Sequence, residues 1–195
     1  MTAMEKTTDL SKTHYAVAGW LAIAQAVLVL PQIALAVFVE ILSESFPVAN
    51  VFLVMMKITG LAVGVYVLYM FKHLLNDRYG FHKTDILILI LIGANAFFFT
   101  LGIIGLIPSL EIAVGIATIV LLVPFSVLEI IFGVLLLKLE DNLFGLKRPF
   151  AYLTIAGGVC GVTVILMPFY FLAGLVSLVI QGMIFLRAKE DMEFL

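Results

Sequence analysis

Charged residues are scarce in this chain of 195 residues, since only 12% are Asp, Glu, Lys or Arg while 64% are hydrophobic. A soluble globular domain carries about twice that share of charge. The composition therefore excludes a water-soluble protein and predicts one whose solvent is lipid. The single cysteine, Cys160, excludes an internal disulfide, a thiolate metal cluster and a CxxC redox pair. A net charge of -2 without a basic run gives no reason to expect nucleic acid as a partner.

Motifs of catalysis are also missing. The three histidines, His14, His73 and His82, lack HExxH spacing, and the sequence contains no GxSxG, P-loop or GxGxxG motif. The polar connections between apolar runs are too short to hold a nucleotide-binding domain. We therefore expect a protein that is not an enzyme and that uses no cofactor and no metal.

Long apolar runs dominate the chain, and a helix needs about 20 apolar residues to cross the hydrocarbon core. Lipid forces backbone groups to pair within their own segment, so runs of this length are α-helices. The sequence predicts an all-α, polytopic membrane protein with one integral membrane domain over 1–195 and no cleaved signal. The six predicted transmembrane helices cover about 15–40, 50–75, 84–107, 111–137, 149–167 and 169–187.

Basic residues gather in four places. Ten of the eleven Lys and Arg residues lie at the N-terminus, in the second-to-third and fourth-to-fifth connections, and at the C-terminus. The other three connections contain none. By the positive-inside rule, both termini are cytoplasmic. The minimal loops favour a plasma membrane, most simply a bacterial inner membrane.

A hairpin is repeated three times along the chain. Pro47, Pro108 and Pro168 fall at regular intervals in the outer turns, where each ends one helix and precedes the next. On the cytoplasmic side, residues 76–83 align without gaps on 141–148, and 187–191 resembles the start of the same element. We predict three helical hairpins over about 15–77, 84–141 and 149–191.

The repeated loop has a structural interpretation and a functional one. Gly80 and Gly145 can adopt the left-handed conformation that stops a helix, so the motif serves as a capping signal. The functional alternative is a surface on which a partner docks.

Small residues recur at four-residue spacing in three of the predicted helices. Such residues let helix backbones approach closely, which is where packing energy comes from in lipid. They indicate close packing within the bundle or association with another subunit. The residues concerned are Ala18, Ala22 and Ala26, then Gly60 and Gly64, then Gly157 and Gly161. Aromatic residues near the predicted interfaces, among them Tyr15, Phe150 and Tyr170, are predicted to be headgroup-level anchors.

Two ionisable residues, Lys57 and Glu129, lie inside the predicted spans, where charge is costly and marks functional candidates. Lys57 is about 10 Å from the outer end of its helix. It can snorkel to the surface or pair with Glu40, or it can belong to a ligand or ion site.

Glu129 is about 13 Å deep, too far to reach the surface. It is expected nearly level with Gln25 and Asn95 of other helices, so that a protonated carboxyl could bond to these amides. Three roles stay open for Glu129: a structural hydrogen-bond donor, a proton- or ion-handling group, and a contact to a partner subunit.

Two functions follow from these features. The first is a non-enzymatic subunit or scaffold of a membrane assembly, whose partners are the bilayer and another membrane protein. The alternative is a small-solute or ion transporter, or the binding subunit of one, with a polar site at Glu129, Gln25 and Asn95, joined by Lys57 toward the outside. Convergence of these side chains on an internal cavity would favour transport, whereas a Glu129 facing lipid would favour a missing partner.

Overall fold

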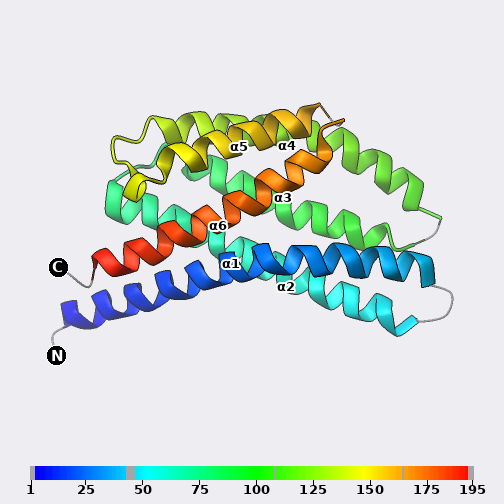
Figure 1. The fold of residues 1–195 in the computed structure, drawn as a ribbon, viewed down its shortest axis with the longest axis horizontal. Coiled ribbons are helices and arrows are strands. Elements are labelled where there is room, and N and C mark those ends of the chain that lie inside the picture. Colours follow the sequence, from blue (N-terminus) through cyan, green and yellow to red (C-terminus); the bar gives the residue numbers. More distant parts are fainter. Residues whose placement is uncertain (1–2, 43–46, 108, 164, 193–195) are drawn as a thin grey trace.

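Helices are the only regular secondary structure in the described part of the computed structural model, which comprises residues 3–42, 47–107, 109–163 and 165–192. Pairs of antiparallel helices follow one another along the chain (Figure 1). The six α-helices are α1 Ala3–Leu42, α2 Pro47–His73, α3 Asp85–Ile104, α4 Glu111–Leu137, α5 Lys147–Val162 and α6 Met167–Asp191. A π-helical turn, Leu74–Arg78, extends α2, and a turn of 3₁₀ helix, Leu143–Gly145, precedes α5.

Five of these helices are long and apolar enough to cross a membrane, which makes the chain a multi-pass membrane protein. The exception is α5, which has 16 residues and is therefore about 24 Å long, against a hydrocarbon core of about 30 Å. The predicted span over 149–167 is thus wrong at its outer end. The helix stops at Val162, with Thr163 at its C-terminal cap, and α6 begins at Met167.

Proline marks helix starts as predicted at two of the three outer turns. Pro47 is the first residue of α2, and Pro168 lies in the first turn of α6, where its missing N–H costs no helical hydrogen bond. Pro108 lies outside the described residues.

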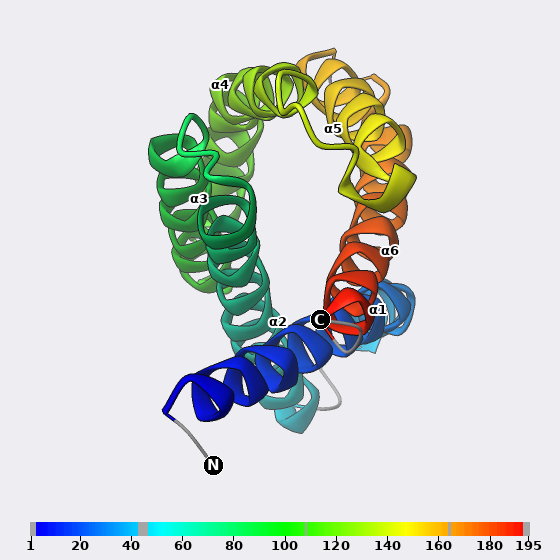
Figure 2. The same ribbon diagram turned by 90° about the vertical axis from the view of Figure 1, so that its left-hand side faces the viewer.

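The six α-helices form a closed ring (Figure 2). Each helix packs against its neighbours in the chain, and the ring closes where α6 packs against α1. Both termini and the connections from α2 to α3 and from α4 to α5 lie at the same end, which we call the terminal end (Figure 1). The other end, which holds the remaining connections, we call the opposite end.

Backbone contacts at glycine hold two sides of the ring. A Cβ on Gly182 of α6 would lie 2.8 Å from the carbonyl oxygen of Gly19 on α1. A Cβ on Gly158 of α5 would lie 2.6 Å from the carbonyl oxygen of Ser126 on α4. At these two contacts the helix axes approach so closely that no side chain fits between them, as small-residue interfaces in lipid require.

The small residues expected at interfaces lie in different surroundings. Ala18, Ala22 and Ala26 are buried, and a Cβ on Gly161 would meet Ser126. A Cβ on Gly157 would lie 3.4 Å from Ala173, and one on Gly64 would lie 3.6 Å from Gln25 Nε2. At Gly60 an added Cβ would have no neighbour within 4 Å. The tight glycine contacts at Gly19, Gly158 and Gly182 were not predicted, since these glycines lie outside the four-residue spacing that was sought.

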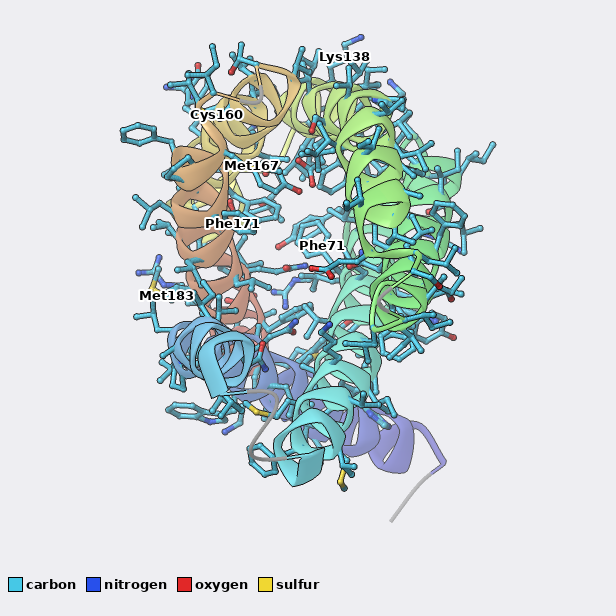
Figure 3. The ribbon with its side chains drawn as sticks, turned by 90° about the vertical axis from the view of Figure 1, so that its right-hand side faces the viewer. Phe71, Lys138, Cys160, Met167, Phe171 and Met183 are labelled. Atoms are coloured by element: carbon cyan, nitrogen blue, oxygen red, sulfur yellow. The ribbon has the colours of Figure 1, made fainter. Side chains whose placement is uncertain are left out.

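An aromatic cluster fills the ring at the terminal end. Phe71 of α2 is completely buried inside the ring (Figure 3), and its ring centroid lies 5.3, 6.1 and 6.3 Å from those of Phe150, Phe185 and Phe132. These four residues, here called the phenylalanine plug, come from α2, α4, α5 and α6. Phe150 and Tyr15, predicted to be interfacial anchors, are only 4% and 6% exposed and belong to this core. The anchor prediction is wrong for both, because proximity to a helix end does not say which face of the helix a residue occupies.

The connections at the terminal end interlock. Gly80 and Gly145 have φ of 59° and 84°, so the predicted left-handed conformation is confirmed at both positions. Arg78 donates to the carbonyl oxygen of Ala188 at 3.0 Å, pairs with Asp191, and lies 5.1 Å from the ring centroid of Phe144. These contacts join parts of all three aligned segments, namely 76–83, 141–148 and 187–191.

Candidate functional site

A cavity of about 330 Å³ lies inside the ring, and residues of all six α-helices line it. Its size is at the lower end of the range of ligand pockets, about 300–1,000 Å³. Most of its lining is apolar, with a few polar side chains. These polar residues are Gln25 of α1, Asn95 of α3, Glu129 of α4, Thr154 of α5, and Tyr170, Ser177 and Gln181 of α6.

Three of the four predicted binding residues meet at this cavity. Gln25, Asn95 and Glu129 all line it, although they are far apart in the sequence. Lys57 is not among the lining residues. It is exposed beside α3, with its Nζ 3.8 Å from the position of a Cβ on Gly102. The side chain of Glu40, its expected partner, lies outside the described residues.

Tyr170 is the immediate partner of the acid. Its hydroxyl donates a hydrogen bond to Oε1 of Glu129 at 3.2 Å, which joins α6 to α4. The prediction that Tyr170 anchors the chain at the headgroups is therefore wrong, because its polar end points to the intramembrane carboxyl. The sequence holds one signal for this contact, because Tyr170 lies within one turn of the start of α6. The depth of that start in the membrane depends on the short length of α5, which the sequence analysis did not predict.

Two glutamines at the cavity keep unused hydrogen-bonding groups. Gln181 is only 5% exposed, and its Nε2 has no hydrogen-bond partner among the described residues. Gln25 donates from Nε2 to the carbonyl oxygen of Gly60 at 3.3 Å, but its Oε1 accepts no hydrogen bond from the part of the chain that the structure describes. Buried polar groups are nearly always paired, and an unpaired one costs about 1–3 kcal/mol. A donor and an acceptor left unpaired beside one cavity therefore indicate a place for water or a ligand.

The remaining polar side chains are partly occupied by their own helices. Asn95 donates from Nδ2 to the carbonyl oxygen of Leu91 at 2.9 Å, and Thr154 donates to that of Phe150 at 2.9 Å. Both bonds link residues four apart on one helix, so these side chains stay at the cavity wall. They make the cavity wall more polar but, within the described ranges, form no hydrogen bond to another helix.

Charge at the cavity is of one sign. Glu129 is the single carboxylate among the lining residues, which include no Lys, Arg or His. No group of three or more His, Cys, Asp or Glu side chains that could hold a metal ion occurs in the described part of the chain. The arrangement provides an acid with hydrogen-bond donors and acceptors in an apolar chamber, which is the chemistry of a binding site.

Comparisons of the chain with protein families, with curated proteins and with solved structures find no match. Fold and cavity together define an all-helical, multi-pass membrane protein whose helix ring encloses a mostly apolar cavity with a few polar side chains.

Proposed function

We propose that this protein is a small-solute transporter, or the binding subunit of one, and that the cavity at Glu129 holds the solute. The observation that carries the proposal is the convergence of Gln25, Asn95 and Glu129 on one internal cavity. A structural acid would face a filled core, and an acid that waits for a partner subunit would face lipid. Glu129 instead faces an apolar chamber together with unpaired amide groups.

The proposed setting is a bacterial inner membrane, with the terminal end in the cytoplasm and three hairpin repeats that cross six times. The distribution of Lys and Arg supports this orientation. The short helix α5 lies between α4 and α6 in the ring, so the protein shields its backbone on both sides. A local thinning of the bilayer accommodates the remaining mismatch in length.

The second proposal is the non-enzymatic subunit or scaffold. It is supported by helical glycines outside the cavity lining whose Cβ position has no neighbour within 4 Å, namely Gly60, Gly93 and Gly115. A helix of a partner could approach the backbone closely at such positions. This function does not need water to reach the cavity, which separates the two proposals in an experiment.

The experiment is cysteine accessibility in a Cys160→Ala background, which contains no other thiol. Ser177→Cys places a thiol in the cavity wall, and Val120→Cys places one on a 62% exposed position of α4 that is not part of the lining. Both variants are treated in intact vesicles with membrane-impermeant methanethiosulfonates, one cationic and one anionic. We expect the Ser177→Cys thiol to react with at least one reagent, because a solute must reach the cavity from water.

The Val120→Cys thiol is expected to stay unmodified, because lipid keeps it neutral and unreactive. Glu140→Cys, at an exposed position of the terminal end, is the positive control for reaction and sidedness. If the Ser177→Cys thiol reacts from neither side while the Glu140→Cys thiol is modified, the cavity is closed to water. The transport proposal is then wrong and the subunit proposal takes its place.

A further inference from the structure

We infer that the cavity takes a hydrophobic organic monocation, an amine or quaternary ammonium on an apolar body, and exchanges it for a proton on Glu129. This inference names the substrate class of the site proposed above and rests on that proposed function. It uses the charge at the cavity, the aromatic side chains in its wall and its size.

Charge balance is the first step. An ionised carboxylate in an apolar chamber is costly unless a cation pairs with it or a proton neutralises it. No basic side chain lines the cavity, so the protein itself provides no cation. The site therefore has two neutral states, one with a proton on Glu129 and one with a bound cation. A single carboxylate balances a single positive charge.

The groups that face Glu129 do not change this balance. Tyr170 of α6 donates its hydroxyl hydrogen to the carboxylate and is the other titratable side chain at the cavity. The helices packed against α4 are α3 and α5, and their lining residues carry no charge. These residues are Leu91, Asn95, Phe150, Leu153, Thr154 and Gly157.

Aromatic rings give the wall a further affinity for cations. Phe132, Phe150, Tyr170 and Phe171 all line the cavity, with 6.5 Å between the ring centroids of Phe132 and Phe150 and 5.7 Å between those of Tyr170 and Phe171. The faces of such rings attract organic ammonium groups. The unpaired Oε1 of Gln25 can accept a hydrogen bond from the N–H of an amine.

Other ligand classes fit the cavity less well. An anion would face the carboxylate without a basic partner. A Ca²⁺ ion takes about 6–8 oxygen ligands, whereas this lining is mostly apolar with one carboxylate. A volume of about 330 Å³ fits one ring with a small ammonium head.

The exchange is balanced in charge. When the cation enters, the carboxyl of Glu129 releases its proton to water and the carboxylate pairs with the cation. When the cation leaves, the carboxylate takes up a proton. One positive charge enters the cavity for each one that leaves it. The bond between the proton and the carboxylate is the one covalent bond that breaks and forms.

The test uses benzyltrimethylammonium and its neutral counterpart of the same shape, neopentylbenzene, on the purified wild-type protein in detergent. Calorimetry measures binding, and a pH indicator in weak buffer measures released protons. We expect the cation to bind at least tenfold more tightly than the neutral compound and to release up to one proton per site. Cation affinity should increase with pH, because fewer protons then compete for Glu129.

Glu129→Gln is the matched variant, since it keeps size and hydrogen bonding but not the charge. We expect it to bind the cation about 30-fold more weakly without proton release, and to bind neopentylbenzene as the wild type does. Phe97→Leu, at a 44% exposed position of α3 that is not part of the lining, is the control and should keep proton release. Equal affinity of the wild type for both compounds, or cation binding without proton release, would overturn the inference even if Glu129→Gln does not fold.

These outcomes are distinct from failure of the proposed function. Binding of neopentylbenzene alone would leave a solute site that does not select cations. Binding of neither compound, together with an unreactive Ser177→Cys thiol, would remove both the site and the inference. Binding of neither compound with a reactive thiol would overturn the inference alone.

Discussion

The two ends of the helix ring are built differently. At the terminal end the phenylalanine plug fills the interior, the connections interlock through Arg78, and most of the buried hydrophobic side chains lie in this half of the ring. Toward the opposite end the interior holds the cavity, and the α1–α2 and α3–α4 hairpins extend beyond the connection between α5 and α6 (Figure 1). The protein thus packs one end of the ring densely and leaves a cavity toward the other end.

Polar residues also have different surroundings at the terminal end and at the cavity. At the terminal end polar side chains bridge the connections, as Arg78 does with Ala188 and Asp191, although Asn76, Thr84 and Asp85 each keep one oxygen without a partner among the described residues. At the cavity, Gln25 and Gln181 keep groups without partners. These two amides border the cavity, where the transport proposal places the solute. Substitutions should therefore lower the stability less at the cavity than in the densely packed parts of the ring, and removal of an unpaired amide there should raise it.

The largest effect is expected where helix backbones touch. Gly182→Leu would place a side chain 2.8 Å from the carbonyl oxygen of Gly19, which cannot move without separating α1 from α6. We expect a loss of about 3 kcal/mol in unfolding free energy, measured by denaturation in mixed micelles. Gly93→Leu, where an added Cβ meets nothing, is the control. Equal stability of the two variants would show that the ring is not closed between α1 and α6.

A pair of phenylalanines compares the two regions directly. Phe71→Ala empties the centre of the plug, whereas Phe171→Ala enlarges a cavity that already exists at a residue 49% exposed. In lipid, burial of an apolar side chain gains little free energy of transfer, so the loss of stability comes mainly from the cavity that the substitution leaves. We expect a loss of roughly 2 kcal/mol for Phe71→Ala and a much smaller one for Phe171→Ala in the same denaturation assay. The reverse order would contradict the assignment of stability to the terminal end.

At the cavity a polar-to-apolar substitution is expected to stabilise the protein. Gln181→Leu removes a buried amide whose Nε2 has no partner, at similar side-chain volume. We expect a gain of about 1 kcal/mol in unfolding free energy together with weaker solute binding. Gln25→Leu, which also removes a hydrogen bond to Gly60, should gain less. A loss of stability in Gln181→Leu would show that its amide is satisfied in the membrane.

The smallest effect concerns Tyr79, which follows α2 at the terminal end. Burial raises the pKa of Tyr79 to about 12, while the nearby Arg78 lowers it in part. Its folded pKa exceeds its unfolded value of about 10, so the folded state holds the proton more tightly. The stabilisation is complete below about pH 10 and is lost as the pH rises through about 12. When the pH is raised from about 9 to 11, the melting temperature of Tyr79→Phe should therefore fall less than that of the wild type. Parallel curves would contradict the burial of this hydroxyl.

Much of the fold and of the candidate site could be predicted from the sequence. Apolar runs gave five of the six spans, because length and composition alone decide whether a helix can cross lipid. The left-handed conformations of Gly80 and Gly145 followed from their place after a helix end. Counting residues from the helix ends placed Gln25, Asn95 and Glu129 at a common depth, and these three residues line one cavity.

The remainder depends on helix rotation, which a uniformly apolar sequence does not reveal. Nothing in the pattern showed that Tyr170 points at Glu129 or that Phe150 is buried, because both could equally face the headgroups. The short α5 was missed because Ile165, Leu166 and Met167 continue the apolar run beyond the end of the helix. The unpaired amide of Gln181 depends on three-dimensional packing.

An experimental structure of the protein in lipid nanodiscs, at a resolution that shows ordered water, tests the central claim most directly. The cavity between Glu129, Gln25 and Gln181 is predicted to contain density that belongs to water or a solute and that contacts the carboxylate. A ring filled by apolar side chains or acyl chains, with Glu129 turned toward lipid or a neighbouring subunit, would contradict the claim.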